Sequence, residues 1–473
     1  MTHALPLCLD EARELPSETL LRRMDKPGPR YTSYPTADRF ADDFGPASLR
    51  HALTERRHLD ESGAATPLSV YVHIPFCDSV CYYCACNKVI TKHHERAATY
   101  LDFLGRELDL VTAEIGAQRS VAQLHLGGGS PTFLSDTEIA HLMVLLRSAF
   151  YLLPDAEISI EVDPRTVTTE RLAHLRTAGF NRISFGVQDF DPDVQQAVHR
   201  VQSFESVRDL MKEARALGFT SINADLIYGL PRQTPESFAR TLAQITELRP
   251  DRIALYAYAH LPERFKPQRR IEAADLPSPV ARIDMLAAAM AQFQGQGYTY
   301  IGMDHFALPD DPLAVAKREG RLHRNFQGYS THADCDLIGL GVSSIGRIGK
   351  SYYQNDKTLP EYYAALDAGR LPVARGLTMT ADDLVRRDII MALMCHGRVE
   401  FHEIDRLHGV HMRADFADEL ARLAPMCADG LVKLEEDAVQ VTSSGWYVVR
   451  AVALVFDRYL KDSAPRERFS KIV

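Results

Sequence analysis

From about residue 67 onward, short runs rich in β-branched and aromatic residues alternate with longer amphipathic segments. The short runs predict β-strands at 69–74, 121–126, 157–162, 182–187, 220–228, 252–258 and 298–303. The amphipathic segments predict helices near 94–116, 136–149, 169–178, 204–217, 235–247 and 278–294, with Ser135 and Thr234 as cap residues at two of the starts. Strands that alternate with helices in this way need right-handed crossovers and a mainly parallel sheet.

Polar residues and glycines stand mainly where the predicted strands end. An open doubly wound sheet and a complete or partial (β/α) barrel both fit the alternation of strands and helices. In a barrel the carboxyl ends of all strands meet at one mouth, whereas an open sheet spreads them along an edge. We favour the barrel because six successive strands end in such residues: Cys77, the run 127–130, Glu161 and Asp163, Gln188 and Asp189, Asp225 and Tyr228, and His260.

The segments on either side of this repeat have a different character. Residues 1–66 hold few strand signals and include a stiff, proline-rich and aromatic stretch at 26–36, which we interpret as an extended arm on the main domain. From about residue 376 the pattern changes to two helices, a hairpin at 431–434 and 439–442, and a final helix. We expect three parts: an N-terminal arm and lead-in at 1–66, a partial barrel at 67–375, and a mainly helical C-terminal domain with a small hairpin at 376–473.

Composition and charge narrow the class of protein. With 473 residues, 46% of them apolar and 25% charged, the chain is of ordinary globular type. A net charge of −9 disfavours binding to nucleic acid or anionic lipid, so an anionic ligand would need a local basic pocket. The C-terminal pattern also resembles a winged helix, but its 13 Lys or Arg against 16 Asp or Glu disfavour DNA binding. Because the sequence has no apolar run of membrane-spanning length and no signal-peptide pattern, we expect a cytoplasmic protein.

The eight cysteines are distributed unevenly. Cys77, Cys81, Cys84 and Cys86 lie within ten residues, whereas Cys8, Cys335, Cys395 and Cys427 are scattered and fit small apolar positions. Three thiolates on this one short loop can hold three irons of a [4Fe–4S] cluster and leave the fourth iron open to another ligand. Zinc is the alternative, but structural zinc commonly draws its ligand pairs from two separated segments. We therefore favour the iron–sulfur cluster.

The cysteine spacing, with Tyr83 before the third cysteine, resembles the signature of radical S-adenosylmethionine (SAM) enzymes. Further segments narrow the resemblance to the family of oxygen-independent coproporphyrinogen III oxidases: 27–36, 71–77, 86–88, 127–131, 161–163, 186–189, 225–231 and 302–305. The resemblance covers nearly the whole chain. It implies a partial (β/α)6 barrel with a helical C-terminal domain, and the conversion of coproporphyrinogen III to protoporphyrinogen IX without oxygen, a step of haem biosynthesis.

The same resemblance implies a [4Fe–4S] cluster held by Cys77, Cys81 and Cys84, and two SAM molecules, as cofactors. The cluster passes an electron to SAM, and the resulting 5′-deoxyadenosyl radical removes a hydrogen from a propionate β-carbon; loss of CO₂ and one more electron leaves a vinyl group. Glu161 suits the amino group of SAM and Asp225 a ribose hydroxyl, because carboxylates accept strong hydrogen bonds. The resemblance places Tyr71, Gly128, Glu161 and Ile345 at the first SAM site, Tyr83, Gly129, Ser130, Gln188, Arg200, Asp225 and Ala259 at the second, and gives Cys86, which is not a cluster ligand, a part in turnover.

Some of these residues also have simpler explanations. The glycines at 127–129 fit a tight turn as well as the close approach of the backbone to a cofactor. Arg200 also fits a solvated helix position, and Ser130 stands where the family pattern leads us to expect threonine. His73 and His305 fit packing at strand ends, and we assign them no role.

The substrate implied by the resemblance carries four propionates, about −4 in charge, because free carboxyl groups titrate near pH 4. Cations must therefore gather at the barrel mouth of this acidic chain. The candidates are Arg30, Arg318, Arg321, His323 and Arg324, for which a solvated basic face is an equally good interpretation. We expect coproporphyrinogen III and a one-electron donor such as flavodoxin or ferredoxin as partners, no nucleic acid, and a monomer.

Two other functions fit much of this pattern. One is a radical-SAM-like haem chaperone, which binds and transfers haem rather than oxidising a porphyrinogen. The arm and the 86–88 extension argue against it, because the resemblance to the chaperone lacks both. The other is a paralogue that modifies a different tetrapyrrole.

Overall fold

The structure is a computed structural model that describes residues 17–24, 26–63, 66–303, 305–332, 335–460 and 469. The chain divides into two compact units. The first, which we call the barrel unit, comprises Arg39–Pro277 and Asp334–Thr378. The second, the companion unit, comprises Met1–Asp38, Ser278–Ala333 and Met379–Val473. Cys8 lies outside the described residues.

A single sheet forms the centre of the barrel unit, with its strands in the order β16-β15-β14-β13-β1-β4-β5-β6-β7-β8. The strands are β1 Leu68–Ile74, β4 Ser120–Gly128, β5 Tyr151–Val162, β6 Arg182–Gln188, β7 Ser221–Tyr228, β8 Arg252–Ala257, β13 Asp336–Leu340, β14 Ile345–Ile348, β15 Ser351–Asn355 and β16 Val373–Thr378. Neighbours from β13 to β8 are parallel, and those from β13 to β16 are antiparallel. The six parallel strands β1 and β4–β8 confirm the predicted α/β partial barrel, whereas β13–β16 were not predicted.

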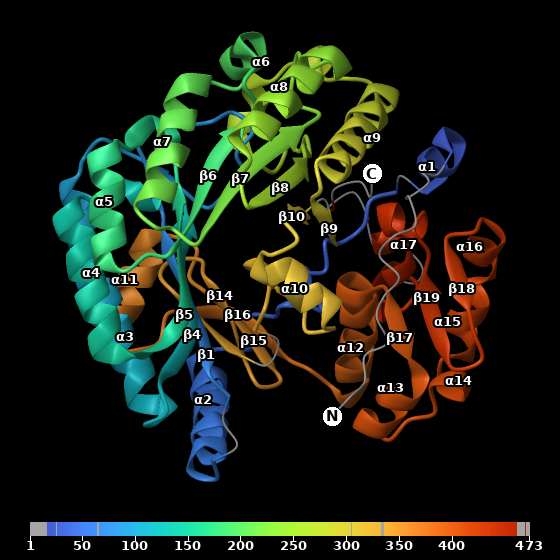
Figure 1. The fold of residues 1–473 in the computed structure, drawn as a ribbon. Helices are drawn as coiled ribbons and strands as arrows, with labels where there is room; N and C mark the ends of the chain where they lie inside the picture. The colour runs from blue at the N-terminus through green and yellow to red at the C-terminus, as the bar shows by residue number, and fades with distance from the viewer. Residues whose placement is uncertain are drawn as a thin grey trace. The chain divides into compact units, whose positions relative to one another are not determined.

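Helices cover the outer side of these strands (Figure 1). They are α2 Pro46–Glu61, α3 Glu95–Ile115, α4 Asp136–Ala149, α5 Thr169–Ala178, α6 Pro192–Ala197, α7 Phe204–Ala216, α8 Pro235–Leu248 and α11 Leu359–Asp367. Ser135 and Thr234 form capping boxes at the starts of α4 and α8, as their sequences predict. Each box pairs backbone N–H groups that the first turn of a helix otherwise leaves unsatisfied.

The companion unit is mainly helical. Its helices are α1 Glu18–Met24, α9 Pro279–Gly295, α10 Pro312–Arg318, α12 Ala381–His396, α13 Phe401–His408, α14 Met412–Asp415, α15 Ala417–Arg422, α16 Ala424–Ala428 and α17 Val449–Leu454. Its strands are β9 Thr299–Gly302, β10 His305–Ala307, β11 His323–Asn325, β12 Gly328–Ser330, β17 Arg398–Glu400, β18 Val432–Leu434 and β19 Ala438–Val441. The predicted C-terminal hairpin is present as β18 and β19.

Two segments of the companion unit differ from the expectation. The run 298–303, predicted as a further strand of the repeat, forms β9 and pairs with β10 in an antiparallel hairpin. The stretch 26–36, expected to lie on the main domain, packs against the C-terminal segment of its own unit. There Tyr31 donates to Asp457 over 3.0 Å, and Arg450 donates to Pro29 O over 3.0 Å. Among the described residues, no helix has the length and apolar character needed to cross a membrane.

Candidate active site

The cysteine loop begins at the carboxyl end of β1 and is closed at its base. The short strands β2 Phe76–Cys77 and β3 Val89–Ile90 pair in parallel, and Val89 N donates to Pro75 O over 2.7 Å. Farther along the loop, Tyr82 N donates to Val198 O over 3.0 Å. These contacts fix both the base and the middle of the loop, and they place its thiols at the strand ends where the sequence predicts the barrel mouth.

Two arginines face the sulfur of Cys81. Arg165 and Arg200 each bring a guanidinium nitrogen to 3.5 Å from Cys81 Sγ. Asp163 lies between them, 2.6 Å from Arg165 and 3.2 Å from Arg200. Two guanidinium groups with one carboxylate leave a net positive charge beside the sulfur, and both guanidinium groups can donate to it. The sequence analysis did not assign Asp163 or Arg165 to the site of the cluster.

The other thiols of the loop influence one another. Burial and the neighbouring Cys84 and Cys81 raise the pKa of Cys77 to about 12. A hydrogen bond from Cys86 lowers the pKa of Cys84. The ammonium group of Lys88 donates to Cys84 O over 3.1 Å and to Cys86 O over 3.3 Å. The loop thus brings several thiol groups close together. Their thiolate forms repel one another unless a cation lies among them.

This donor set fits an iron–sulfur cluster. Cys77, Cys81 and Cys84 are free thiols on one anchored loop, with cationic donors at Cys81. A cubane binds each thiolate at a different iron, so its ligands need not surround one ion. Within the described ranges no three His, Cys, Asp or Glu side chains could hold a single metal ion.

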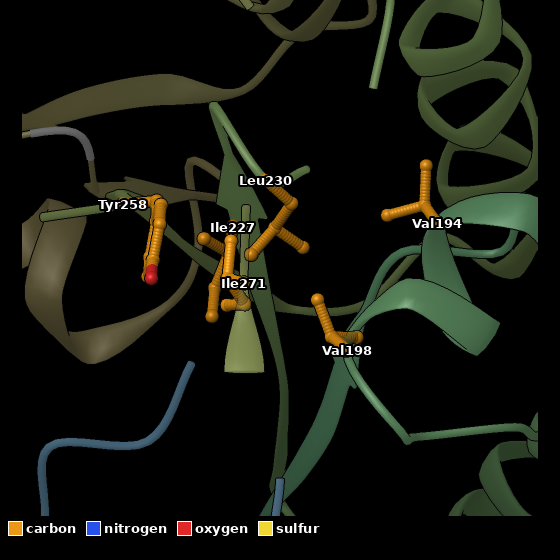
Figure 2. Close-up of a cluster of buried hydrophobic side chains, with 6 residues drawn as sticks. All are labelled: Val194, Val198, Ile227, Leu230, Tyr258 and Ile271. Carbon is orange, nitrogen blue, oxygen red and sulfur yellow. The ribbon is translucent and has the colours of Figure 1, made fainter. Parts of the chain in front are cut away.

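Tyr82 and Tyr83 anchor the loop on an apolar base. Both pack against a cluster of six buried side chains, shown in Figure 2: Val194, Val198, Ile227, Leu230, Tyr258 and Ile271. Gln268 donates to Tyr83 O over 3.0 Å and to Ala259 O over 3.1 Å. Ala259, which follows β8, is therefore tied to the same loop as Tyr83, and the sequence analysis assigns both to the second SAM site.

The glycine run at the end of β4 is crowded by the protein itself. A Cβ on Gly127 would lie 3.1 Å from the Glu161 carboxyl group, and a Cβ on Gly128 would lie 2.6 Å from the His73 ring. A Cβ on Gly129 would lie 2.7 Å from backbone oxygens of the segment after β1. Gly128 also has φ +117°, a region that favours glycine. Packing inside the barrel unit thus accounts for these glycines before any cofactor is considered.

Glu161 is held in its ionised form. His125 Nε2 lies 3.4 Å from Glu161, and Gly128 N donates to its carboxylate over 3.1 Å. Burial alone would raise the pKa of Glu161, but these hydrogen bonds hold it below its usual value. An anionic Glu161 beside Gly128 suits a ligand with a cationic amino group.

His73 connects Tyr71 to the far end of the cysteine loop. Burial lowers the pKa of His73, so its ring is neutral. One ring nitrogen lies 3.0 Å from Asn87 O, to which it must donate, and the other lies 3.0 Å from the Tyr71 hydroxyl, from which it accepts. His73, for which the sequence predicts no role, thus positions Tyr71.

Gln188, Arg200 and Asp225 lie at or beyond the ends of β6 and β7. Gln188 has φ +69°, and a Cβ on Gly186 would meet both Gln188 Nε2 at 2.9 Å and Arg200 Nη2 at 2.8 Å. Arg200 is 6% exposed, donates to Gly186 O over 2.6 Å, and its buried Nε has no hydrogen-bond partner. The alternative of a solvated helix residue is therefore wrong for Arg200.

Asp225 accepts from Ser184 over 2.7 Å and from Asn223 over 2.9 Å. Burial raises the pKa of Asp225 to about 6, and the nearby charge of Glu161 adds to the shift. The two carboxylates thus influence each other, although the sequence analysis assigns them to different SAM molecules. Ser130 is 9% exposed and its hydroxyl lies 3.2 Å from that of Thr132.

A buried network not foreseen from the sequence supports the loop before Ile345. Glu107 accepts from Gly341 N over 2.7 Å, from Tyr362 over 2.6 Å and from Asn355 over 2.6 Å. Burial raises the pKa of Glu107 to about 7, against the lowering effect of these donors. Glu107 is the one acidic residue among the buried, otherwise apolar side chains of α3. An acidic residue in the apolar face of a predicted helix is the signal in the sequence that could have identified it.

The proposed substrate-binding cations lie in the companion unit and differ in burial. Arg318 and Arg321 are exposed; Arg318 donates to Pro309 O over 2.6 Å, and Arg321 pairs with Glu319. Arg324 is 3% exposed, donates to Arg30 O over 3.3 Å, and has a buried Nη1 with no hydrogen-bond partner. The solvated interpretation fits Arg318 and Arg321 but not Arg324.

Comparison with known proteins extends these observations. The model of the radical SAM superfamily matches residues 71–245, and that of the HemN C-terminal domain matches residues 379–448. The oxygen-independent coproporphyrinogen III oxidase of Pseudomonas aeruginosa is 50% identical over 456 residues, which are 96% of this chain and 98% of the relative. The enzyme of the same name from Escherichia coli K12 is 49% identical over 454 residues, with the same coverage of both chains.

A solved structure is also similar over most of the chain. It is described as coproporphyrinogen III oxidase (HemN) from Escherichia coli, a radical SAM enzyme. It matches with a TM-score of 0.87 and 49% identity, covering 91% of this chain and 98% of that one.

Proposed function

Because the chain belongs to the family of oxygen-independent coproporphyrinogen III oxidases, within the radical SAM superfamily, we propose that its barrel mouth performs the family's reaction with the residues described above. The chain is an oxidoreductase of haem biosynthesis that converts two propionates of coproporphyrinogen III to vinyl groups without oxygen, yielding protoporphyrinogen IX. Its cofactors are a [4Fe–4S] cluster and SAM, two molecules per product. The observation that carries this conclusion is 50% identity over 96% of the chain.

When bound, the cluster and SAM supply the one-electron chemistry that removes a hydrogen atom from each propionate. Cys77, Cys81 and Cys84 hold the cluster. The N–H groups of Arg165 and Arg200, each 3.5 Å from Cys81 Sγ, stabilise the negative charge on that sulfur. Cys86 stays off the cluster as an exposed thiol that acts in turnover.

The first SAM molecule is held by Tyr71, Gly128, Glu161 and Ile345. The ionised Glu161 pairs with the amino group of SAM, and the hydrogen bond to His73 fixes the position of Tyr71.

The second SAM molecule is held by Tyr83, Gly129, Ser130, Gln188, Arg200, Asp225 and Ala259. The unpartnered Nε of Arg200 supports this assignment, because a buried donor without an acceptor is costly unless a ligand supplies one. Asp225 accepts from a ribose hydroxyl.

The remaining partners belong to the same proposal. Coproporphyrinogen III binds through cations that include Arg324, and a one-electron donor such as flavodoxin or ferredoxin reduces the cluster. The enzyme acts as a monomer in the cytoplasm, where a reducing environment keeps the four clustered thiols reduced. The chain works as an arm at 1–66, a catalytic barrel at 67–375 and a C-terminal domain at 376–473.

Anaerobic reconstitution with iron and sulfide, followed by reductant, SAM and coproporphyrinogen III, tests this function. We expect protoporphyrinogen IX, separated by chromatography, together with 5′-deoxyadenosine. Haem retained through purification without cleavage of SAM would instead indicate a chaperone. Formation of a different tetrapyrrole product would indicate a paralogue.

A further inference from the structure

The cysteine loop turns Tyr82 and Tyr83 to different neighbours. Tyr83 lies beside Arg200 and Cys81 and interacts electrostatically with both. Tyr82 stacks on the exposed ring of His199, with centroids 5.2 Å apart and an interplanar angle of 10°. Arg270 covers Tyr82 at 5.1 Å from its centroid and lies 3.3 Å from its hydroxyl. Tyr82 immediately follows the cluster ligand Cys81 and is half-buried, so it brings that ligand close to the surface.

The segment that carries Arg270 is strongly basic. It forms a short 3-10 helix, Lys266–Arg270, in which Lys266, Arg269 and Arg270 are exposed. Arg269 donates to Pro262 O over 3.0 Å, and across the described ranges none of the three has an ion pair with a carboxylate. The nearest acidic residues in sequence, Glu263 and Glu272, flank the helix.

This basic helix is tied to the cysteine loop by a hydrogen bond and by shared apolar packing. Gln268, within the helix, is 1% exposed and donates to Tyr83 O over 3.0 Å. Ile271, which follows it, is 6% exposed and belongs to the apolar cluster of Figure 2, on which Tyr82 and Tyr83 also pack. Val201, two residues beyond His199, is 64% exposed. We call Lys266, Arg269, Arg270, Tyr82, His199 and Val201 the basic patch.

We propose that the basic patch docks an acidic protein that carries a single low-potential electron and passes it to the cluster. The step is an outer-sphere electron transfer. The carrier is oxidised by one electron and the cluster is reduced by one, and no bond is formed or broken and no proton is transferred. This inference rests on the proposed function, since only a redox-active cluster needs such a partner.

Charge and position carry the inference. A chain of net charge −9 repels an acidic protein over most of its surface, so three unneutralised cations beside a ligand of the cluster mark where approach is favourable. The aromatic ring of Tyr82, which Arg270 covers, and the exposed side chain of Val201 give the patch the mixed character of a protein interface. Docking beside Tyr82 also leaves Tyr83 and Arg200 available to SAM.

The test reverses charge without touching the loop. Lys266→Glu and Arg269→Glu are combined, because neither side chain contacts the cysteine loop through a recorded hydrogen bond among the described residues. Lys212→Glu with Lys350→Glu, two exposed lysines on α7 and in the β14–β15 turn, makes the same change in net charge elsewhere. Iron content and melting temperature check that both double variants fold and hold the cluster.

The readouts are the rate of cluster reduction by a reduced acidic flavodoxin, in stopped-flow at low salt, and the Kd of the oxidised flavodoxin for the holoenzyme. In the patch variant we expect the reduction rate to fall about 10- to 100-fold and the Kd to rise by about the same factor. The rate should also lose most of its dependence on salt concentration, whereas the control variant should match the wild type in both measurements. Reduction by dithionite, a small reductant, stays unchanged in every variant.

Three results would overturn the docking inference: equal loss in the control variant, no loss in the patch variant, or no reduction of the wild-type cluster by the flavodoxin while dithionite reduces it. Failure of the proposed function is seen separately. If dithionite and SAM give no 5′-deoxyadenosine with the wild type, the radical SAM assignment fails, whatever the patch binds.

Discussion

The two sets of residues assigned to SAM differ in how fully the protein satisfies them. In the first set, Tyr71 is oriented by His73 and Glu161 accepts from His125 and Gly128. In the second set, Arg200 keeps a buried Nε without a partner, and burial raises the pKa of Asp225 to about 6. Asp225 in the second set also accepts two hydrogen bonds, so the difference between the sets is the unused donor of Arg200. We therefore expect Arg200, more than any residue of the first set, to gain a hydrogen bond when a ligand binds.

The largest expected effect removes what both sets share. Cys77→Ser, Cys81→Ser and Cys84→Ser should each abolish the cluster and product formation, because a cubane with one iron open needs all three thiolates. Cys86→Ser should keep most of the iron and lose turnover. Iron and sulfide analysis after reconstitution measures the first effect, and chromatography of the product measures the second. Loss of iron from Cys86→Ser as complete as from the others would contradict this assignment.

Arg200 and Arg165 offer a matched pair that separates the second set from the cluster. Both contact Asp163 and Cys81, but only Arg200 binds Gly186 O at the end of β6 and has the unpartnered Nε. Arg200→Met should lower the free energy of unfolding by about 3–5 kcal/mol, because it breaks a buried ion pair, and should lower SAM stoichiometry from two to one. Arg165→Met should cost less and keep both SAM molecules. Equal SAM binding by the two variants would remove Arg200 from the second site.

Strand order and chemistry were predictable from the sequence to different extents. Alternating apolar runs fixed β1 and β4–β8, and the 77–86 cysteine spacing located the cluster loop. The strands β13–β16 were missed because they are short and because β13, β14 and β16 carry glycines, at 339, 346 and 376, which weaken the strand pattern.

Contacts between distant segments could not be predicted at all. Glu107 and Asn355 are 248 positions apart, and the basic helix at Lys266–Arg270 lies far along the chain from Tyr82. A pattern read within one window gives the face of an element but not its partner. Arg200 illustrates this limit. Its neighbours in sequence allow a solvated position, but in the fold Arg200 contacts Cys81 and Asp163, which come from distant segments.

The next prediction concerns Glu107, the buried carboxyl group that holds the loop before Ile345 of the first set. Its pKa is about 7 in the folded protein and about 4.3 when unfolded, so the folded state binds the extra proton between these values. Stability from this group is therefore complete below about pH 4.3 and is lost as pH rises to about 7, by about 4 kcal/mol. Glu107→Gln should lack this loss, which denaturant unfolding from pH 5 to pH 8 measures against the wild type. Parallel pH curves for the two proteins would show that Glu107 does not titrate in this range.

The smallest effect concerns Asp225, and it decides whether the second set binds a separate SAM molecule. If Asp225 accepts ribose hydrogen bonds, Asp225→Ala removes a charge-assisted contact of about 1.5–3 kcal/mol, or about 10- to 150-fold in affinity. Ser184→Ala is the matched control, because it removes a donor to Asp225 but keeps the carboxylate. Equilibrium binding to the reconstituted protein should show one retained and one weakened site in Asp225→Ala, with iron unchanged, and two near-normal sites in Ser184→Ala. A wild type that saturates with a single SAM, or an Asp225→Ala protein that binds two with unchanged affinity, would make the second set part of the first site, which the mutual influence of Asp225 and Glu161 also allows.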